Sequence, residues 1–373
     1  MTSTDERVGA PLSVLFDGYW LLDGPPSGRN VVGSLIAAWS AQYPDDRLTV
    51  ALPSSPPASL ESHHGFDAGI GFVEIPPRVR NHGLWVTGRI GRIAAPYDVV
   101  ITQNFTPWRG TFASTKRVTF VHDALFVDHP NWFTLPELAY FSGIGVGTRN
   151  ADLVLTSSRS EQRRIQHAWP RLRERVEAVG LGVPTALALA VSRRPTALPE
   201  AERPYILAVG RLNYRKNLRA LIAAYSSSPR LSSSYDLVIV GAADGKDPGL
   251  DGVEVPGSVR FLGHVTDGEL AWLYRHCELF AFPSLGEGFG LPLLEAAYFS
   301  ARTIASDIGV FREIGVAESY FDPHSIESIG AALERALATG ASSPRHPEPS
   351  TGWESVAVRT RRAVHQALKG EAR

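Results

Sequence analysis

Residues Pro283 to Glu295 read Pro-Ser-Leu-Gly-Glu-Gly-Phe-Gly-Leu-Pro-Leu-Leu-Glu, and this stretch decides the fold of the second half of the chain. The apolar run Leu279-Phe-Ala-Phe282 before it is typical of a buried strand. The glycines predict a turn, and Pro292 suits the first turn of a helix that follows. A strand, a glycine-rich turn and a helix in this order are typical of an α/β domain.

Two carboxylates flank the expected start of this helix. Glu287 lies in the turn, and Glu295 lies roughly 5 Å along the helix axis, about one turn in. The backbone N–H groups of Phe289, Gly290 and Leu291 should point out of the helix start, where the helix dipole favours an anion. A ligand that is part phosphate and part polyhydroxyl, such as a nucleotide-sugar, fits this arrangement.

Size and charge limit the class of protein. The chain has 373 residues, which favours two domains, and 44% of them are hydrophobic, enough for sizeable cores. The formal net charge of −1 argues against a dedicated nucleic-acid binder, so we expect no nucleic-acid partner.

The sequence also limits the compartment. Its single cysteine excludes a disulfide framework within one chain, which suits a reducing compartment. No apolar run reaches the length of about 18 residues that a membrane-spanning helix needs. The polar residues Met1–Arg7 are not followed by the apolar region of a signal peptide. We therefore expect a cytoplasmic protein, with possible peripheral contact at the inner face of the membrane.

A basic cluster follows the first strand of the second half. Tyr205–Val209 reads as a strand, and Arg211, Arg215 and Lys216 lie between it and the next expected helix. A helix start does not favour cations by itself, because its dipole attracts anions. These side chains would be favourable at this position if they bind a diphosphate that lies between them. The alternative is a solvated loop whose positive charges have no ligand.

The first half opens with the same pattern. Ser13–Phe16 reads as a strand, a turn-rich segment with Gly28 and Arg29 follows, and Val31–Trp39 has helical spacing. The Gly28 loop could bring the backbone close to a phosphate or a sugar, or serve only a tight turn. It lacks the three-glycine fingerprint of a nicotinamide site.

His122 and Asp123 follow the apolar strand Arg117–Val121. In an open α/β sheet, ligands bind beyond the carboxyl ends of the strands, so this position favours His122 over the other histidines. The alternative is a His–Asp pair that only caps a turn.

A basic segment covers residues 78–117, with seven Lys or Arg residues against one acidic residue. Apolar residues such as Trp85 and Ile90 are interleaved with these charges. The segment could form a basic amphipathic helix that contacts an anionic membrane surface or an acidic acceptor. The alternative is an ordinary helix with a solvated basic face, because Gly83, Gly88 and Gly91 weaken the helix.

Strand and helix alternate twice along the chain, which predicts an α/β protein of two doubly wound, Rossmann-like domains facing across a cleft. We expect an N-terminal acceptor-side domain at 1–183, completed by a C-terminal helix at 353–373. A Pro-containing linker at 184–204 and a nucleotide-sugar domain at 205–350 lie between them.

The second half resembles glycosyltransferase family 4, the retaining enzymes of the GT-B fold that include bacterial mannosyl- and rhamnosyltransferases of polysaccharide assembly. The resemblance rests on Gly210-Arg-Leu with Lys216-Asn-Leu, on Val259-Arg-Phe-Leu-Gly-His-Val265, on Gly286-Glu-Gly-Phe-Gly-Leu-Pro-Leu-Leu-Glu-Ala296, on Ala305-Ser-Asp307 and on Phe321-Asp-Pro323. In the first half it rests on Gly28-Arg29, His122-Asp123 and Pro130-Asn-Trp-Phe133. The chain departs from the family pattern at Leu285 and in the Pro-Pro-Ser-Gly28 loop.

The resemblance implies roles for these residues. Arg211 and Lys216 would bind the donor diphosphate, Glu295 the ribose hydroxyls and Glu287 the sugar being transferred. The remaining implied donor contacts are the N–H groups of Phe289, Gly290 and Leu291, His264 and Val265 near the base, Gly28 in the first loop, and His122, which would reach the donor sugar. The residues expected to support catalysis are His122, Arg211, Lys216 and Glu287. The family's C-terminal helix usually crosses back to the first domain.

The expected reaction is a retaining transfer that needs no metal and no cofactor. No Asp-x-Asp metal pair stands at a strand end, and cations with a helix start can neutralise the leaving diphosphate. The resemblance favours GDP-mannose or dTDP-rhamnose as donor, and a glycan or lipid-linked acceptor. The alternatives are a non-catalytic nucleotide-sugar-binding protein and an epimerase or phosphorylase of the same fold.

Overall fold

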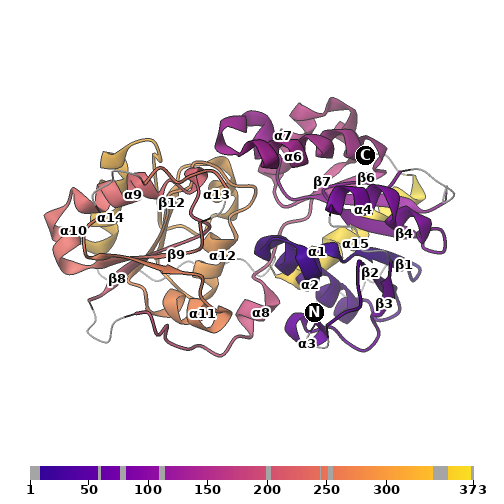
Figure 1. Ribbon diagram of the computed structural model, residues 1–373, viewed down its shortest axis with the longest axis horizontal. Helices are drawn as coiled ribbons and strands as arrows, with labels where there is room; N and C mark the ends of the chain where they lie inside the picture. The colour runs from indigo at the N-terminus through magenta and orange to yellow at the C-terminus, as the bar shows by residue number, and fades with distance from the viewer. Residues whose placement is uncertain are drawn as a thin grey trace, which may run out of the picture. The chain divides into compact units, whose positions relative to one another are not determined.

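The computed structural model describes residues 9–57, 60–75, 81–108, 114–198, 203–243, 245–250, 255–338 and 352–370. Within these ranges the chain forms two compact units, whose helices and strands are labelled in Figure 1. Unit 1 holds residues up to Ala124, Ala139–Thr185 and the segment from Gly352 onward. Unit 2 holds Leu125–Leu138 and Ala186–Thr351. The polar residues Met1–Arg7 and residues 339–351 lie outside the described residues.

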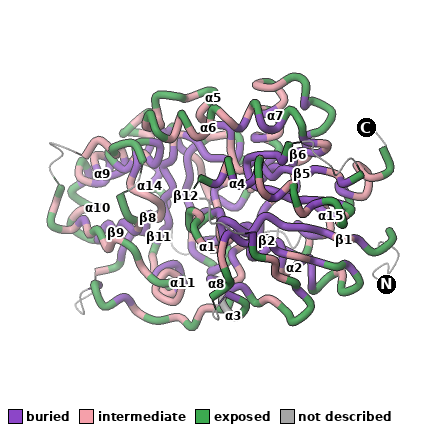
Figure 2. Tube along the Cα trace, turned by 45° about the vertical axis from the view of Figure 1, so that its right-hand side comes forward, coloured by how far each residue is buried: buried purple, intermediate pink, exposed green. Residues whose placement is uncertain are grey.

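Unit 1 is built on a parallel sheet of seven strands in the order β3-β2-β1-β4-β5-β6-β7. The strands are β1 (Ser13–Asp17), β2 (Arg47–Leu52), β3 (Gly71–Glu74), β4 (Val99–Gln103), β5 (Lys116–Val121), β6 (Leu153–Thr156) and β7 (Val176–Ala178). The central strands β1, β4 and β5 are buried along most of their length, because both of their faces are covered (Figure 2). Of the seven strands, β1 and β5 match the strands predicted at Ser13–Phe16 and Arg117–Val121.

The helices of unit 1 connect these strands. They are α1 (Tyr19–Asp23), α2 (Pro26–Gln42), α3 (Leu60–His64), α4 (His82–Gly88), α6 (Leu135–Gly147, whose first residues belong to unit 2), α7 (Arg159–Ala168) and α15 (Trp353–Lys369). The last helix, α15, packs against α2 and near β5 and β6. It buries Trp353, Val356 and Val364, so the C-terminal helix returns to the first unit.

Unit 2 has a parallel sheet of six strands in the order β10-β9-β8-β11-β12-β13. They are β8 (Tyr205–Val209), β9 (Asp236–Val240), β10 (Val259–Gly263), β11 (Leu279–Phe282), β12 (Thr303–Ser306) and β13 (Ser319–Phe321). Its helices are α5 (Leu125–Asp128), α8 (Thr185–Ala188), α9 (Leu218–Ser226), α10 (Pro229–Ser234), α11 (Asp267–His276), α12 (Leu291–Tyr298), α13 (Gly309–Ile314) and α14 (Ile326–Ala338). The predicted α/β class with doubly wound sheets is confirmed in both units.

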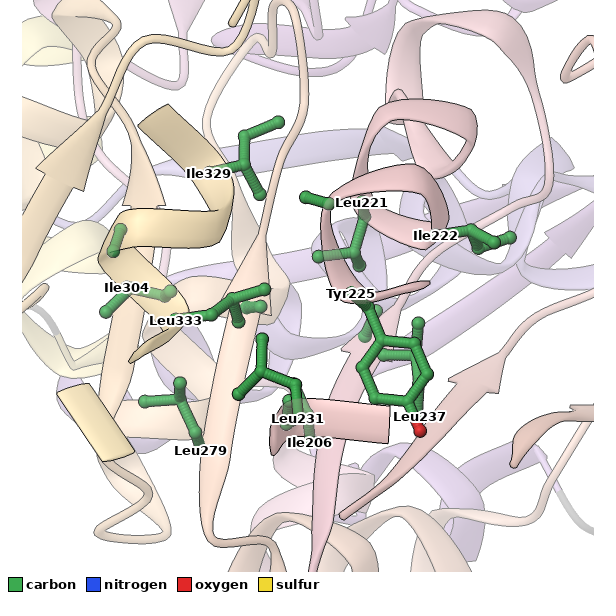
Figure 3. Close-up of a cluster of buried hydrophobic side chains, with 14 of the residues drawn as sticks. Ile206, Leu221, Ile222, Tyr225, Leu231, Leu237, Leu279, Ile304, Ile329 and Leu333 are labelled. Atoms are coloured by element: carbon green, nitrogen blue, oxygen red, sulfur yellow. The ribbon is translucent and has the colours of Figure 1, made fainter. Parts of the chain in front are cut away.

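The core of unit 2 shows why α9 and α14 pack on its sheet. Figure 3 shows Leu221 and Tyr225 of α9 and Ile329 and Leu333 of α14 above Leu279 of β11, all of them buried. Their spacing of four residues places each pair on one face of its helix. This burial fixes the first turn of α9, and therefore the basic loop before it.

The helix expected in the basic segment at 78–117 is short, and no long amphipathic helix lies in the described part of this segment. Its described part is the short helix α4, the 3-10 turn η1 (Ile90–Arg92) and the strands β4 and β5. Arg117 is buried and ion-paired with Asp152, with 3.2 Å between Arg117 Nε and Asp152 Oδ2. Residues 76–80 and 109–113 lie outside the described residues, and with them Arg78, Arg80 and Arg109.

Residues Leu125–Leu138 group with unit 2, although the chain on both sides of them belongs to unit 1. The reason is visible at Gly286, where a Cβ atom would lie 2.7 Å from the ring of Trp132 and 3.3 Å from Leu125. The loop with the large aromatic residues therefore packs directly on the Gly286 turn. A division of the chain at one linker, as expected from the sequence, does not separate this segment.

Candidate functional site

The sheet of unit 2 has a topological switch point between β8 and β11. From β8 the chain continues to β9 on one side, and from β11 it continues to β12 on the other. In doubly wound sheets, ligands bind outside the carboxyl ends of the two strands at this point. The basic loop follows β8 and the Glu287 turn follows β11, so the order of strands brings the two predicted motifs together.

The loop after β8 is shaped by its backbone. Gly210 has a φ of +149°, and a Cβ atom there would lie 2.7 Å from Cε of Lys216. The 3-10 turn η5 (Tyr214–Lys216) follows, and Asn217 then adopts the left-handed conformation. The Asn217 side chain holds this conformation by donating to the carbonyl oxygens of Pro283 (3.2 Å) and Pro323 (2.7 Å). Lys216 is thereby fixed towards the carboxyl end of β11.

A buried cluster of charges lies at this point. Lys216 Nζ is 2.6 Å from Glu287 Oε1, and the Ser284 hydroxyl donates to the same oxygen at 2.7 Å. Arg215 pairs with the other oxygen, Glu287 Oε2. The Lys216 ammonium lies 4.7 Å from the centre of the Phe282 ring. Two cations against one carboxylate leave the cluster with a net positive charge that an anion can offset.

The charges of the cluster fix its protonation. Burial opposes ionisation of Glu287, but Arg215 and Lys216 outweigh it and lower the pKa of Glu287 to about 2. Burial lowers the pKa of Lys216 to about 8, although Glu287 partly offsets this. At neutral pH, Glu287 is therefore a carboxylate and Lys216 an ammonium.

The start of α12 lies beside this cluster. Gly290 caps the helix with a φ of +109°, and a Cβ atom there would lie 2.6 Å from the Phe311 ring. Among the described residues, the N–H groups of Phe289, Gly290 and Leu291 have no hydrogen-bond acceptor. The turn thus presents unpaired N–H donors, as the sequence predicts.

Glu295 lies one turn into α12 and is buried. The Tyr274 hydroxyl of α11 donates to Glu295 Oε2 at 2.9 Å. Burial raises the pKa of Glu295 to about 7, although the hydrogen bond from Tyr274 lowers it in part. Glu295 is therefore much closer to titrating at neutral pH than Glu287.

The other predicted residues of unit 2 lie around this centre. Arg211 is partly exposed in the loop after β8, and its charge helps to lower the pKa of Lys216. His264 is exposed, and Val265 is partly buried, in the connection from β10 to α11. Sequence reasoning gave Arg215 less weight than its neighbours and missed Tyr274. Arg215 carries a signal in its position next to Lys216, whereas the contact of Tyr274 joins two helices.

In unit 1, His122 directly follows β5. Its Nε2 lies 2.8 Å from Gln103 Oε1, and its ring packs between Trp20 and Phe120. Burial, and secondarily the charge of His82, lowers the pKa of His122 to about 3, so the ring is neutral at physiological pH. The role of His122 towards a donor sugar stays a prediction.

Gly28 does not lie in a loop, which corrects the expectation for this residue. It is the third residue of α2, which begins at Pro26, earlier than the apolar periodicity indicates. A Cβ atom at Gly28 would lie 2.4 Å from the Trp20 ring, so the glycine is needed for the packing of Trp20. The contact of Gly28 with a donor stays a prediction.

No helix in the described ranges has both the length and the apolar character needed to cross a membrane.

Comparison with known proteins supports this reading of unit 2. Residues 192–347 match the family model described as Glycosyl transferases group 1. A serotype-specific mannosyltransferase, WbdA of Escherichia coli, is 30% identical over 260 residues, which cover 66% of this chain and 31% of that protein. The chain thus spans about a third of the length of this relative.

Two solved structures share the fold. Sucrose-phosphate synthase from Thermosynechococcus elongatus has a TM-score of 0.68 at 19% identity, over 97% of this chain and 100% of that one. HepE of Anabaena in complex with UDP-glucose has a TM-score of 0.61 at 18% identity, over 96% of this chain and 99% of that one. These likenesses confirm the GT-B fold.

Proposed function

We propose that this chain, which matches the model of glycosyl transferases group 1 over residues 192–347, is a retaining, metal-independent glycosyltransferase that moves a hexose or deoxyhexose from a nucleotide-sugar to a glycan or lipid-linked acceptor. One observation carries the proposal. Lys216, Arg215 and Glu287 form a buried ionic cluster at the switch point of the unit 2 sheet, beside the unpaired N–H groups at the start of α12. A net positive site next to carboxylates suits a diphosphate joined to two sets of hydroxyl groups.

In this proposal the cations and the helix start act on the leaving group. The bond between the sugar C1 and the diphosphate oxygen breaks, and Lys216 with Arg211 offsets the charge that develops on the diphosphate. The acceptor oxygen attacks C1 from the same face. Its proton passes to a phosphate oxygen of the leaving group. No protein nucleophile is required.

The two glutamates take separate roles. Glu287 is ionised and held by Arg215 and Lys216, so it can accept hydrogen bonds from the sugar while fixing Lys216. Glu295 lies further along α12 and would accept hydrogen bonds from the ribose hydroxyls. Tyr274 then orients Glu295, and His264 and Val265 would lie near the base.

The donor is proposed to be GDP-mannose, with dTDP-rhamnose as the second choice, because the curated relative is a mannosyltransferase. The acceptor and a cytoplasmic location are also part of the proposal. Arg117 is buried and cannot contact a membrane. Among the described arginines of the basic segment, only Arg89 and Arg92 are accessible enough to do so.

A panel of nucleoside diphosphates and their sugars should identify the base. A ligand that binds only the folded protein at about 100 times its Kd stabilises it by about 2.7 kcal/mol. We expect one diphosphate to raise the melting temperature by several degrees in differential scanning fluorimetry, and GDP to do so most. If none of GDP, UDP, dTDP or ADP shifts the melting temperature, the donor-site assignment is wrong.

Nucleotide affinity should also depend on pH through Glu295. The ionised Glu295 carboxylate can accept hydrogen bonds from both ribose hydroxyls. Because the pKa of Glu295 is about 7, its protonated form becomes more populated below pH 7. The Kd of the nucleoside diphosphate should therefore rise as the pH falls from 7 to 6, where Lys216 is already an ammonium, by up to about tenfold per unit below the pKa of Glu295. Titration calorimetry on the wild type and on Glu295→Gln checks this, because the variant should bind weakly and lose the dependence. Binding of similar strength and pH profile in both proteins would remove Glu295 from the ribose site.

A further inference from the structure

Unit 1 has its own topological switch point, between β1 and β4. These neighbouring parallel strands end in Asp17 and Gln103, and the chain leaves them towards opposite edges of the sheet. The position is equivalent to the one that holds the charged cluster in unit 2. The proposed donor site uses neither residue.

Asp17 anchors a chain of polar groups at this point. It is fully buried, and its carboxylate accepts from the N–H groups of Tyr19 (3.0 Å) and Gln103 (3.2 Å). Asp17 Oδ2 is also 2.8 Å from Nε2 of His82, and His82 Nδ1 is 3.0 Å from the Tyr140 hydroxyl. The carboxylate thus fixes the ring of His82, and His82 fixes the Tyr140 hydroxyl.

Such a buried pair of polar residues is difficult to explain by stability alone, because apolar residues of similar volume often stabilise a fold as well as a buried polar pair does. The apolar neighbours Tyr19 and Trp20 pack against His82, with ring centres 5.2 Å and 5.1 Å from its own. The polar chain instead leads from the strand end to a cavity.

The cavity has a volume of about 610 Å³, within the range of roughly 300–1,000 Å³ that is common for small-molecule sites. Its lining residues are Tyr19, Trp20, Asp23, Pro25, Asn81, His82 and Tyr140. Neither lysine nor arginine is among these described lining residues. Arg29, the arginine of the α1–α2 segment, donates from Nη2 to the Gly24 carbonyl oxygen at 3.4 Å.

We propose that this cavity binds an uncharged sugar ring of the acceptor, with the Tyr140 hydroxyl forming a hydrogen bond with a ring hydroxyl and Asp17 and His82 acting as positioning residues for Tyr140. The inference rests on the proposed transferase function and names the substrate class on the acceptor side. Tyr19 and Trp20 give the cavity an apolar wall that suits the C–H groups of a sugar, and Asn81 and Tyr140 suit its hydroxyl groups.

The charge of the cavity selects against an anionic ligand. Asp17 lies behind it, Asp23 lines it, and the described lining offers no guanidinium or ammonium group to pair with a phosphate. Burial raises the pKa of Tyr140 well above the ordinary value for tyrosine, so its hydroxyl stays neutral and adds no negative charge to the cavity. A neutral glycoside should therefore bind here better than a sugar phosphate.

The test measures binding directly, with methyl α-D-mannopyranoside as the neutral probe and mannose 6-phosphate as the anionic one. Ligand-observed NMR on the full chain should detect the neutral probe and give a weaker signal with the phosphate. Tyr140→Phe removes only the hydroxyl and should weaken binding of the neutral probe about tenfold. The matched control is Tyr205→Phe, which removes a hydroxyl that donates to the Leu273 carbonyl oxygen in unit 2, and it should bind as the wild type does.

A separate measurement tests whether His82 positions the Tyr140 hydroxyl. His82→Gln should also weaken binding, and the double variant His82→Gln/Tyr140→Phe should bind no more weakly than Tyr140→Phe, because both changes act through one hydroxyl. Additive losses would overturn the positioning role. Equal melting temperatures of the variants, and an unchanged response to the nucleoside diphosphate, show that the fold is retained.

The outcomes separate this inference from the transferase proposal. Binding of the glycoside without binding of any nucleotide would support the sugar cavity and count against the donor site. Binding of a nucleotide with no binding of the glycoside overturns the sugar cavity alone. Stronger binding of mannose 6-phosphate, or wild-type affinity in Tyr140→Phe, also overturns it.

Discussion

Lys216→Ala is expected to lower kcat for sugar transfer by about a hundred- to a thousandfold. The ammonium lies in the buried cluster, 2.6 Å from Glu287, where it would offset the charge that develops on the leaving diphosphate. Removal of one preorganised donor from such a site typically has an effect of this size, because no water can replace it equally well. Initial rates with the nucleotide-sugar found in the thermal panel, with and without acceptor, measure the loss.

The effect of this change on the fold should be small by comparison. Glu287 keeps Arg215 and the Ser284 hydroxyl as partners, so no buried carboxylate is left alone. Glu287→Gln is harsher for the fold, because it leaves two buried cations without a counter-charge. The control Lys369→Ala removes an exposed lysine from the last turn of α15 and should keep full activity. A Lys216→Ala protein that melts normally and transfers within threefold of the wild-type rate contradicts the site.

The fold was largely predictable because its signals are local. Each strand is an apolar run of its own, and several helix starts carry explicit caps. A capping box joins Thr266 and Glu269 at the start of α11, and Ser158 accepts from the Glu161 N–H group at the start of α7. The helix α6 was missed, because glycines and apolar residues occur on all of its sides and give no helical period.

The candidate site was predictable only in part. Lys216 and Glu287 belong to motifs that follow adjacent strands, so the order of strands brings them together. Arg215 and Tyr274 act through contacts to Glu287 and Glu295, which are far away in sequence. In unit 1, the contacts of Asp17 with His82 and of His82 with Tyr140 span 65 and 58 residues, and no periodicity reveals such pairs.

Asp46→Asn is expected to destabilise unit 1 by about 3 kcal/mol or more, the usual effect of removing one partner from a buried ion pair. Arg361 of α15 donates to Asp46 through Nε (2.8 Å) and Nη2 (3.0 Å), and both side chains are buried. Trp39 Nε1 and the Leu12 N–H group each donate to the same carboxylate at 2.8 Å. The carboxylate therefore ties the C-terminal helix to α2 and to the residue before β1.

The neighbouring residue provides the control, because Asp45 is exposed and Asp45→Asn should leave the melting temperature unchanged. The pH dependence adds a second check. Burial opposes ionisation of Asp46, but the hydrogen bonds from Arg361 and Trp39 outweigh it and lower its pKa below 3.8. The wild type should thus lose this stabilisation as the pH falls from 3.8 through the folded pKa, and Asp46→Asn should not. Calorimetry that finds equal melting temperatures for Asp46→Asn and Asp45→Asn at pH 7 would show that α15 is held to unit 1 by its apolar face alone.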